Sequence, residues 1–380
     1  MVICFDATTE AKRSLDALIA TGQFKDTSDA ISIALTSYEA IQRGMARGTQ
    51  PTVECAPTER PEKSQPVEAT ESSIRTLKAS ALGPQIPELL FLNTATANGI
   101  KLADVPPVKD ASTNPPAKWL FGQYNKFLPV KVSSRALLNL LRQKPAGVIL
   151  SEAVETISQA AWEFGDYLNI LDERTKRSRE DSFAAAFPVS AGNGAVSRIR
   201  FANQFVGDLR QPKQAEGQPK ETKFNGLPSA LKFFFCADGK SPLVTLTTAG
   251  AEFALLRNPI LDSAKDEIAQ QKFSEAEVSF LLAHIRNHVP EETAAYLSII
   301  DAIQAEANNP DEVDKFLCER FNLRIAAKTE TENDITQTFL TTQRTGAISR
   351  MVDLGLLTRQ KEGLRVTYSI TNQAKAFRGQ

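Results

Sequence analysis

A polar segment at residues 48–88 divides this chain of 380 residues and limits what it can fold into more than any other feature. Pro, Glu, Ser and Thr dominate the segment, and large apolar residues are sparse in it. Such a composition cannot bury enough surface to offset the entropy that ordering would cost. We therefore expect a flexible linker at 48–88, which isolates a small unit at 1–47.

The rest of the chain is too long for one ordinary core, so we expect a middle domain at 89–262 and a C-terminal domain at 263–380. With 42% hydrophobic and 23% charged residues, the composition is that of a soluble globular protein. The net charge of -1 gives no global signal for nucleic acid or membrane, so any such signal must be local.

The sequence shows neither a targeting signal nor cysteines at paired spacing. The sequence has no run of 18 apolar residues and no basic segment followed by a long apolar one at its start, so we expect neither a membrane span nor a signal peptide. Its four cysteines are scattered without paired spacing, which favours reduced thiols in a cytoplasmic protein over a disulfide or zinc framework.

Hydrophobic periodicity predicts a mainly α fold with small β elements. The stretch 133–143 has helical spacing, with Ser133 or Ser134 as its N-cap, whereas 196–209 alternates in part and predicts a strand. The chain after residue 274 is mostly helical in pattern.

Two short pieces, 243–256 and 367–379, resemble each other. Each has a β-rich run that ends in Thr247 or Thr371, and a Phe follows six residues later. Thr is a good N-cap, so each piece predicts a strand followed by a capped helix. The repetition suggests two copies of one small unit.

The C-terminal piece predicts a helix over 341–355 and then a β-hairpin around KEG at 361–363. Ser349, Arg350 and the Gly-Leu-Leu at 355–357 match the winged-helix family, which this piece resembles. The resemblance implies that the helix enters the major groove and that the hairpin, the wing, touches backbone or minor groove. From residue 341 to the end there are seven Arg or Lys and two acidic residues, so the local charge agrees with DNA binding.

The candidate DNA contacts follow from this resemblance. The residues expected to reach bases are Gln343, Arg344, Thr345 and Ser349, and those expected to reach phosphates are Arg350, Arg359, Lys361 and Arg365. The alternative is a winged helix used only for packing or dimerisation.

The middle domain carries a second local signal, because no acidic residue occurs between 111 and 151. Basic residues there can bind a phosphate backbone, and the interleaved aromatic rings favour a core role. This domain is interpreted as a second, more decorated winged helix. Its candidate DNA-binding residues are Lys118, Lys126, Lys131 and Arg135.

The first unit has the pattern of a strand and two helices over residues 2–42, and it resembles the ribbon-helix-helix family. The resemblance implies an obligate dimer, which explains how so small a unit is stable. It also implies a phosphate at the start of the second helix, where Thr27 and Ser28 lie. The groove-facing positions hold Val2, Cys4 and Asp6 in place of the family's usual long polar residues. The unit is therefore interpreted mainly as a dimeriser, and DNA contact by its ribbon is left open.

The search for catalytic patterns returns little. His284 and His288 lie four residues apart on one helical pattern, with no Glu between them and no nearby Cys. We interpret them as helix-surface histidines and predict no metal site, no cofactor and no enzymatic activity.

The sequence thus predicts an N-terminal ribbon-helix-helix unit followed by one or two winged-helix domains, in a dimeric, non-enzymatic protein that binds double-stranded DNA and regulates transcription. One alternative is a structural or adaptor subunit of a larger nucleic-acid-processing or defence complex, in which the winged helices bind a protein partner. A second is a nucleic-acid enzyme with an unrecognised carboxylate site.

Overall fold

The computed structural model describes residues 85–94, 99–107, 114–178, 181–190, 194–207, 225–237, 242–263, 269–327, 331 and 334–379. The chain divides into two compact units, Met1–Thr70 and Glu71–Gln380, and all described residues belong to the second. The predicted ribbon-helix-helix unit, with Thr27 and Ser28, and residues 48–84 of the predicted linker lie outside the described residues.

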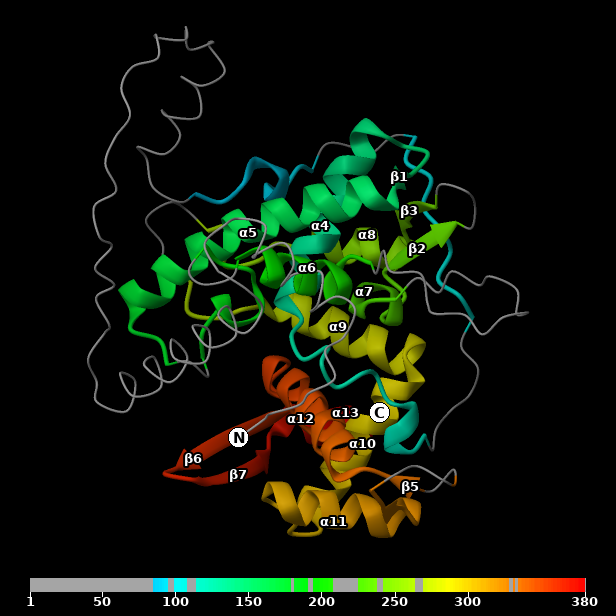
Figure 1. Ribbon diagram of the computed structural model, residues 1–380, viewed down its shortest axis with the longest axis vertical. Helices are drawn as coiled ribbons and strands as arrows, with labels where there is room; N and C mark the ends of the chain where they lie inside the picture. The colour runs from blue at the N-terminus through cyan, green and yellow to red at the C-terminus, as the bar shows by residue number, and fades with distance from the viewer. Residues whose placement is uncertain are drawn as a thin grey trace, which may run out of the picture. The chain divides into compact units, whose positions relative to one another are not determined.

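The described residues are mainly helical with three small sheets, which confirms the predicted class of a mainly α fold with small β elements (Figure 1). The helices in the first half are α4 (Leu128–Gln143), α5 (Leu150–Thr175), α6 (Gly194–Phe205), α7 (Leu227–Ala230) and α8 (Thr248–Leu255). Those in the second half are α9 (Glu275–His288), α10 (Pro290–Gln304), α11 (Pro310–Phe321), α12 (Gln337–Asp353) and α13 (Asn372–Gly379). Short 3-10 turns are η1 (Glu88–Leu90), η2 (Pro116–Lys118) and η3 (Ala184–Ala186). Within these ranges no helix is long and apolar enough to cross a bilayer.

The first sheet joins β1 (Val148–Ile149), β3 (Leu243–Leu246) and β2 (Phe234–Ala237) in the order β1-β3-β2. Both pairings are antiparallel, with Val148 opposite Val244 and Phe234 opposite Leu246. A short parallel pair joins β4 (Arg324–Ile325) to β5 (Asp334–Ile335). The third sheet is an antiparallel hairpin of β6 (Leu357–Glu362) and β7 (Arg365–Ile370).

The predicted pair of similar units appears as the same local design in both halves. In each, a residue with positive φ, Lys232 at +61° or Gly355 at +69°, precedes a hairpin. In each, the Thr after the hairpin caps the next helix: the Thr247 hydroxyl accepts from Gly250 N, and the Thr371 hydroxyl accepts from Ala374 N. The two predicted caps are therefore confirmed.

The same two threonines also hold the start of their hairpin. The Thr247 hydroxyl donates to the Lys232 carbonyl at 2.7 Å, and the Thr371 hydroxyl donates to the Gly355 carbonyl at 2.7 Å. Each Thr thus ties three segments together, because it closes the turn before the hairpin and opens the helix after it. Phe253 and Phe377, six residues after these threonines, are both buried.

Two predicted elements are corrected. Helix α4 begins at Leu128 rather than near Ser133, because Pro129 fits in the first helical turn, where its missing N–H needs no partner. Ser133 and Ser134 are therefore buried inside the helix and do not cap it. The predicted strand at 196–209 is instead helix α6, because buried Phe201 and Phe205 lie one helical turn apart and pack towards α5.

Candidate nucleic-acid interface

Helix α12, which contains most of the predicted base-reading residues, turns them in two directions. Thr345 is exposed and Ser349 is half-buried, one helical turn apart on the accessible side. Gln343, Arg344 and Arg350 are enclosed, with exposed fractions of 2%, 4% and 0%. The prediction that these three side chains contact DNA is corrected, since the fold leaves them no access to a nucleic acid.

One enclosed face of α12 is covered by residues 116–124, which we call the strap. The amide of Gln343 donates to the Pro116 carbonyl at 3.0 Å, and the Arg350 guanidinium donates to the Tyr124 carbonyl. Between them, Gly346 crosses Gly122 so closely that a Cβ on Gly346 would lie 2.1 Å from the Gly122 oxygen. Positions 343, 346 and 350 are spaced along one helical face, so the strap accounts for the burial of both polar side chains.

Arg350 also forms a fully buried ion pair with Glu292 of α10. Its Nε and one terminal nitrogen donate to the two carboxylate oxygens at 2.5 and 2.8 Å, and both side chains have an exposed fraction of 0%. The geometry is that of a bidentate guanidinium–carboxylate pair. Glu292 thus occupies the place that a phosphate would need.

Arg344 is enclosed on the neighbouring face by α11. Its guanidinium donates to both carboxylate oxygens of Asp314, at 2.6 and 3.3 Å. Asp314 also accepts from the amide of Gln337 at 3.0 Å, so it links the first turn and the middle of α12 to α11. Arg344 therefore joins two helices and does not read a base.

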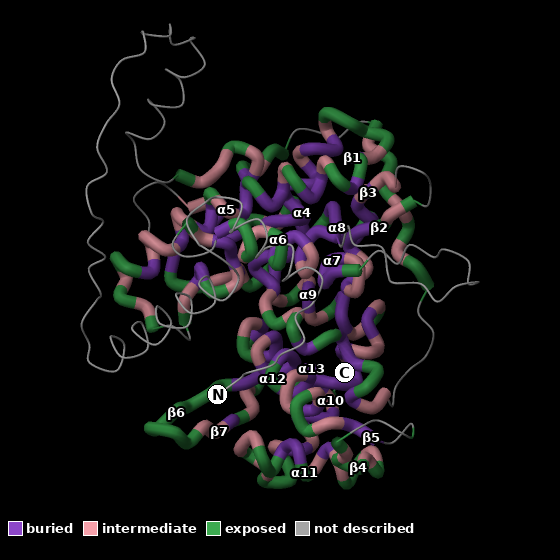
Figure 2. Tube along the Cα trace, viewed as in Figure 1, coloured by how far each residue is buried: buried purple, intermediate pink, exposed green. Residues whose placement is uncertain are grey.

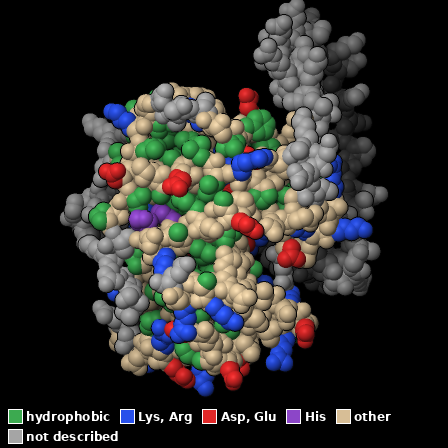
Figure 3. Space-filling model, turned by 180° about the vertical axis from the view of Figure 1, so that it is seen from behind, with side chains coloured by type: hydrophobic (Ala, Val, Ile, Leu, Met, Phe, Trp, Pro, Cys, Tyr) green, Lys and Arg blue, Asp and Glu red, His purple; other side chains and the backbone are tan. Residues whose placement is uncertain are grey.

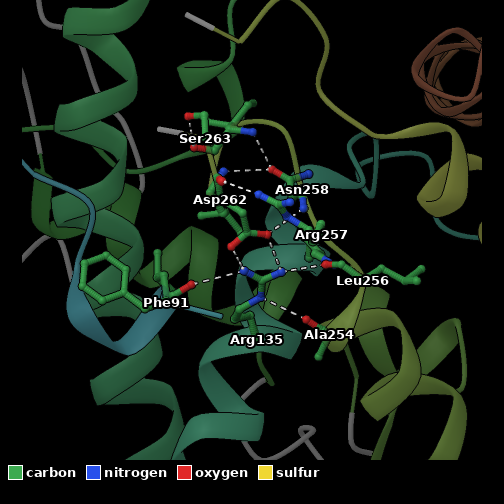
Figure 4. A network of polar contacts seen from close by, with 12 residues as sticks. Phe91, Arg135, Ala254, Leu256, Arg257, Asn258, Asp262 and Ser263 are labelled. Atoms are coloured by element: carbon green, nitrogen blue, oxygen red, sulfur yellow. Dashed lines mark hydrogen bonds and ion pairs between the residues drawn. The ribbon is translucent and has the colours of Figure 1, made fainter. Parts of the chain in front are cut away.

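Two of the basic residues predicted in the middle domain are likewise structural, and the prediction that Lys131 and Arg135 bind DNA is corrected. Arg135 on α4 is 1% exposed and pairs with both oxygens of Asp262, at 2.5 and 3.0 Å. It also donates to the carbonyls of Ala254 and Leu256, so it anchors the end of α8 and the following loop (Figure 4).

Lys131 lies one turn before Arg135 and is also fully buried. Its Nζ donates to the carbonyls of Phe253 and Leu256 at 2.5 and 2.6 Å and lies 3.0 Å from a carboxylate oxygen of Glu277. Burial lowers the pKa of Lys131 to about 8, against the opposing effect of the Glu277 carboxylate.

The other two predicted basic residues of this region differ from each other. Lys118 is exposed at the end of η2. Lys126 is half-buried, with its Nζ 3.6 Å from Asp353 at the end of α12, and burial lowers its pKa. Lys118 stays available to a phosphate, whereas Lys126 supports the junction between the strap and α12.

The hairpin β6–β7 keeps all its predicted cations accessible. Arg359, Lys361 and Arg365 are exposed, and Glu362 is the single acidic residue between 357 and 370. The base of the hairpin is anchored by Tyr368, whose side chain is buried and whose N–H donates to the Asn308 carbonyl at 2.7 Å. Beyond this anchor, the two strands extend away from the helices (Figure 1).

The histidine prediction is half right. His288 is half-buried, but His284 is 5% exposed, with Nε2 2.7 Å from the Leu231 carbonyl and its ring against Phe233 and Phe280. Burial lowers the pKa of His284 to about 4, so the ring is neutral at pH 7 and donates through Nε2. No group of three or more His, Cys, Asp or Glu in the described ranges is placed to hold a metal ion.

One accessible residue of α12, Thr338, is not among the predicted site residues. It is exposed seven residues before Thr345, so Thr338, Thr345 and Ser349 share one side of the helix. The sequence pattern that would have identified it is the spacing of the buried positions Leu340, Ala347 and Met351, which fixes the side that faces outwards. Seen from behind, the molecule shows Lys and Arg scattered among Asp and Glu, with the histidines among hydrophobic side chains (Figure 3). The accessible side of α12 and the hairpin together are the candidate interface.

Comparison of the chain with protein-family models, with curated proteins and with solved structures finds no match.

Proposed function

We propose that the chain is a dimeric, non-enzymatic DNA-binding protein that regulates transcription. One observation carries the proposal: a helix with accessible Thr and Ser hydroxyls on one side leads directly into a protruding hairpin with exposed cations. Ser and Thr hydroxyls pair with either donors or acceptors on base edges, and cations bind phosphates without regard to sequence. Such a surface combines the two kinds of contact that sequence-specific binding needs.

The order of elements supports a winged-helix assignment for both halves. In the first, helix α4, strand β1 and helix α5 precede α6, α7, the hairpin β2–β3 and the capped helix α8. In the second, α10, the loop at Asn308 and α11 precede α12, the hairpin β6–β7 and the capped helix α13. In the first half β3 pairs with β1, which follows α4, and in the second the Tyr368 N–H of β7 donates to the Asn308 carbonyl, which follows α10. This similarity favours two copies of one domain type.

The residue roles in the proposal follow exposure. Thr338, Thr345 and Ser349 face base edges, and Arg359, Lys361 and Arg365 bind phosphates. Lys118 is a further phosphate contact. Dimerisation through residues 1–47 would bring two such surfaces to one duplex, and the tether would raise the effective concentration of the second.

The test is a salt series with the full chain and a duplex from the region upstream of its own coding sequence, against a random duplex. Each phosphate contact contributes about 0.9 to the slope of log affinity against log salt. Changing Arg359, Lys361 and Arg365 together to Ala should therefore lower the slope by about 2.7 per protomer. A matched control changes three exposed cations of the first half, Lys101, Lys144 and Arg174, and should leave the slope nearly unchanged.

Two results would overturn the proposal. One is wild-type binding that is weak and equal for both duplexes. The other is a hairpin triple variant whose affinity and slope match those of the wild type.

A second candidate function, the adaptor, is favoured by one feature of α6. Val196 and Ile199 lie three residues apart on this helix and are 49% and 62% exposed. Neighbouring exposed apolar side chains on one helix are suited to a protein partner. If this candidate is right, changing both residues to Ser abolishes partner binding at any salt concentration, and the hairpin triple variant has no effect.

A further inference from the structure

The turn of the hairpin β6–β7 holds a large apolar side chain at the position furthest from the body. Leu364 has a relative exposure of 101%, and the next most exposed large apolar residue among those described is Ile199, at 62%. Figure 2 shows the tip of the hairpin as exposed throughout. Nothing within the described fold covers this side chain.

The turn itself does not require a leucine. Strand β6 ends at Glu362 and β7 begins at Arg365, so Gly363 and Leu364 form a two-residue turn. Gly363 has a φ of +61°, and Leu364 is not among the residues with positive φ. This is the pattern of a type II′ turn, which needs Gly first and accepts a polar residue second. The apolar side chain is therefore not explained by the local conformation.

The surroundings of Leu364 carry two cations and one acid. Arg365 follows it directly and pairs across the ladder with Glu362, and Lys361 lies in the next pair. Three of the six residue pairs lie beyond the anchor at Tyr368, so the projecting part of the hairpin reaches about 10 Å at about 3.3 Å per residue. An apolar tip on a basic ribbon of this length would arrive at a duplex with its cations level with the phosphates and its leucine beyond them.

The width of the hairpin determines which part of it can enter the minor groove of DNA. Two paired strands are about 4.8 Å apart before side chains are added, and the minor groove of B-DNA is about 6 Å wide. The ribbon does not fit inside that groove, but one leucine does. Leucine is among the side chains that wedge between base steps from the minor groove and kink the duplex.

We propose that Leu364 is a wedge that enters the minor groove, partly unstacks one base step and bends the DNA, while the hairpin cations hold the flanking phosphates. The proposal rests on the proposed function and adds a deformation to it. A lipid surface is a poorer fit, because stable anchoring at a bilayer needs more apolar area than one side chain offers.

The experiment uses the full chain and a duplex of about 30 base pairs with central TA steps, which are easily unstacked. Donor and acceptor dyes on the two ends report the bend, and 2-aminopurine at the central step reports unstacking. Wild type should shorten the end-to-end distance and raise the 2-aminopurine signal. Leu364→Ser, which suits a type II′ turn, should lose both signals while it keeps the salt slope. Leu255→Ser on α8, where the leucine is 41% exposed, is the matched control and should keep all three.

The outcomes separate the wedge from the proposed function. If wild type binds with a steep salt slope and leaves the duplex straight, or if Leu364→Ser bends it equally, the wedge is wrong and DNA binding stands. If wild type shows no salt-dependent binding, the proposed function fails and the wedge fails with it. Capture on anionic vesicles that is lost in Leu364→Ser would assign the tip to a lipid surface and overturn the proposal.

Discussion

The buried pair of Arg350 and Glu292 gives the sharpest test of how α12 is held in the fold. Changing Arg350 to Met keeps a long apolar side chain but leaves the Glu292 carboxylate in a fully enclosed site without its cation. Removing one partner of a buried ion pair typically costs about 3–5 kcal/mol, because the remaining charge is uncompensated. The strap also loses a donor to the Tyr124 carbonyl, which adds about 1 kcal/mol.

The double variant with Arg350→Met and Glu292→Met is the informative partner. It removes both charges and replaces them with side chains of similar length, a change that is often nearly neutral in a buried pair. We therefore expect it to be more stable than Arg350→Met alone by about 2–3 kcal/mol, a coupling typical of residues in direct contact. The exposed Arg359→Met on the hairpin serves as the control and should change stability by less than about 0.5 kcal/mol.

Urea unfolding followed by tryptophan fluorescence measures these three variants and the single variant Glu292→Met, because Trp119 is 5% exposed and lies in the strap. The reasoning is refuted if Arg350→Met lies within about 0.5 kcal/mol of wild type, or if the double variant shows the sum of the two single losses. The effects on DNA affinity should differ from the effects on stability. Arg359→Met should lose affinity while fully folded, whereas the Arg350 and Glu292 double variant should keep its affinity.

Two further predictions concern the acid side of the stability curve and the N-terminal unit. His284 has a pKa of about 4 when folded against 6.5 as its ordinary value, so the unfolded chain binds more protons between these pH values, and the free energy of unfolding falls as the pH drops through that window. This loss of unfolding free energy reaches about 3 kcal/mol and is measured as the difference between urea midpoints at pH 7 and pH 4.5. The difference should be smaller in His284→Gln, whose amide can still donate to the Leu231 carbonyl. It should be retained in His288→Gln. Deleting residues 1–47 should halve the mass seen by light scattering, and an unchanged mass would remove the dimeriser role.

The predictions that hold are those decided by neighbours in the sequence. The hairpin at 357–370 follows from a glycine with positive φ before it and another at its turn, and the helix caps follow from Thr247 and Thr371. The mainly α class follows from helical periodicity. These signals span a few residues, so the chain can be read for them directly.

The burial of the cations depends on partners far away in the sequence. Arg135 pairs with a carboxylate 127 residues further on, and Arg350 pairs with one 58 residues before it. Lys131 and Arg135 therefore looked like phosphate contacts in a basic stretch, although both are buried and paired inside the fold. An excess of Lys and Arg in a local window says nothing about which acidic residue, elsewhere in the chain, will neutralise each one.

Predicting the candidate interface requires knowing which side of α12 faces outwards, and the sequence pattern leaves that side ambiguous. Residues 343–350 include polar side chains at nearly every angle, so choosing an outward face by polarity placed Gln343 and Arg344 on the wrong side. What decides the phase is Gly346, because only a residue without a side chain allows the strap to cross at that point. If Gly346 is interpreted as the point where another segment crosses the helix, the sequence predicts that Gln343 and Arg350 face inwards.

The contacts on the inner side of α12 fix the orientation of its outer side. The strap holds positions 343, 346 and 350, while Lys126 and Lys272 both reach Asp353 at the helix end, at 3.6 and 3.0 Å. Rotating α12 to present another face would break a buried ion pair and the strap crossing together. Thr345 and Ser349 are thus held in one orientation relative to the hairpin, and substitutions there should change DNA affinity without changing stability.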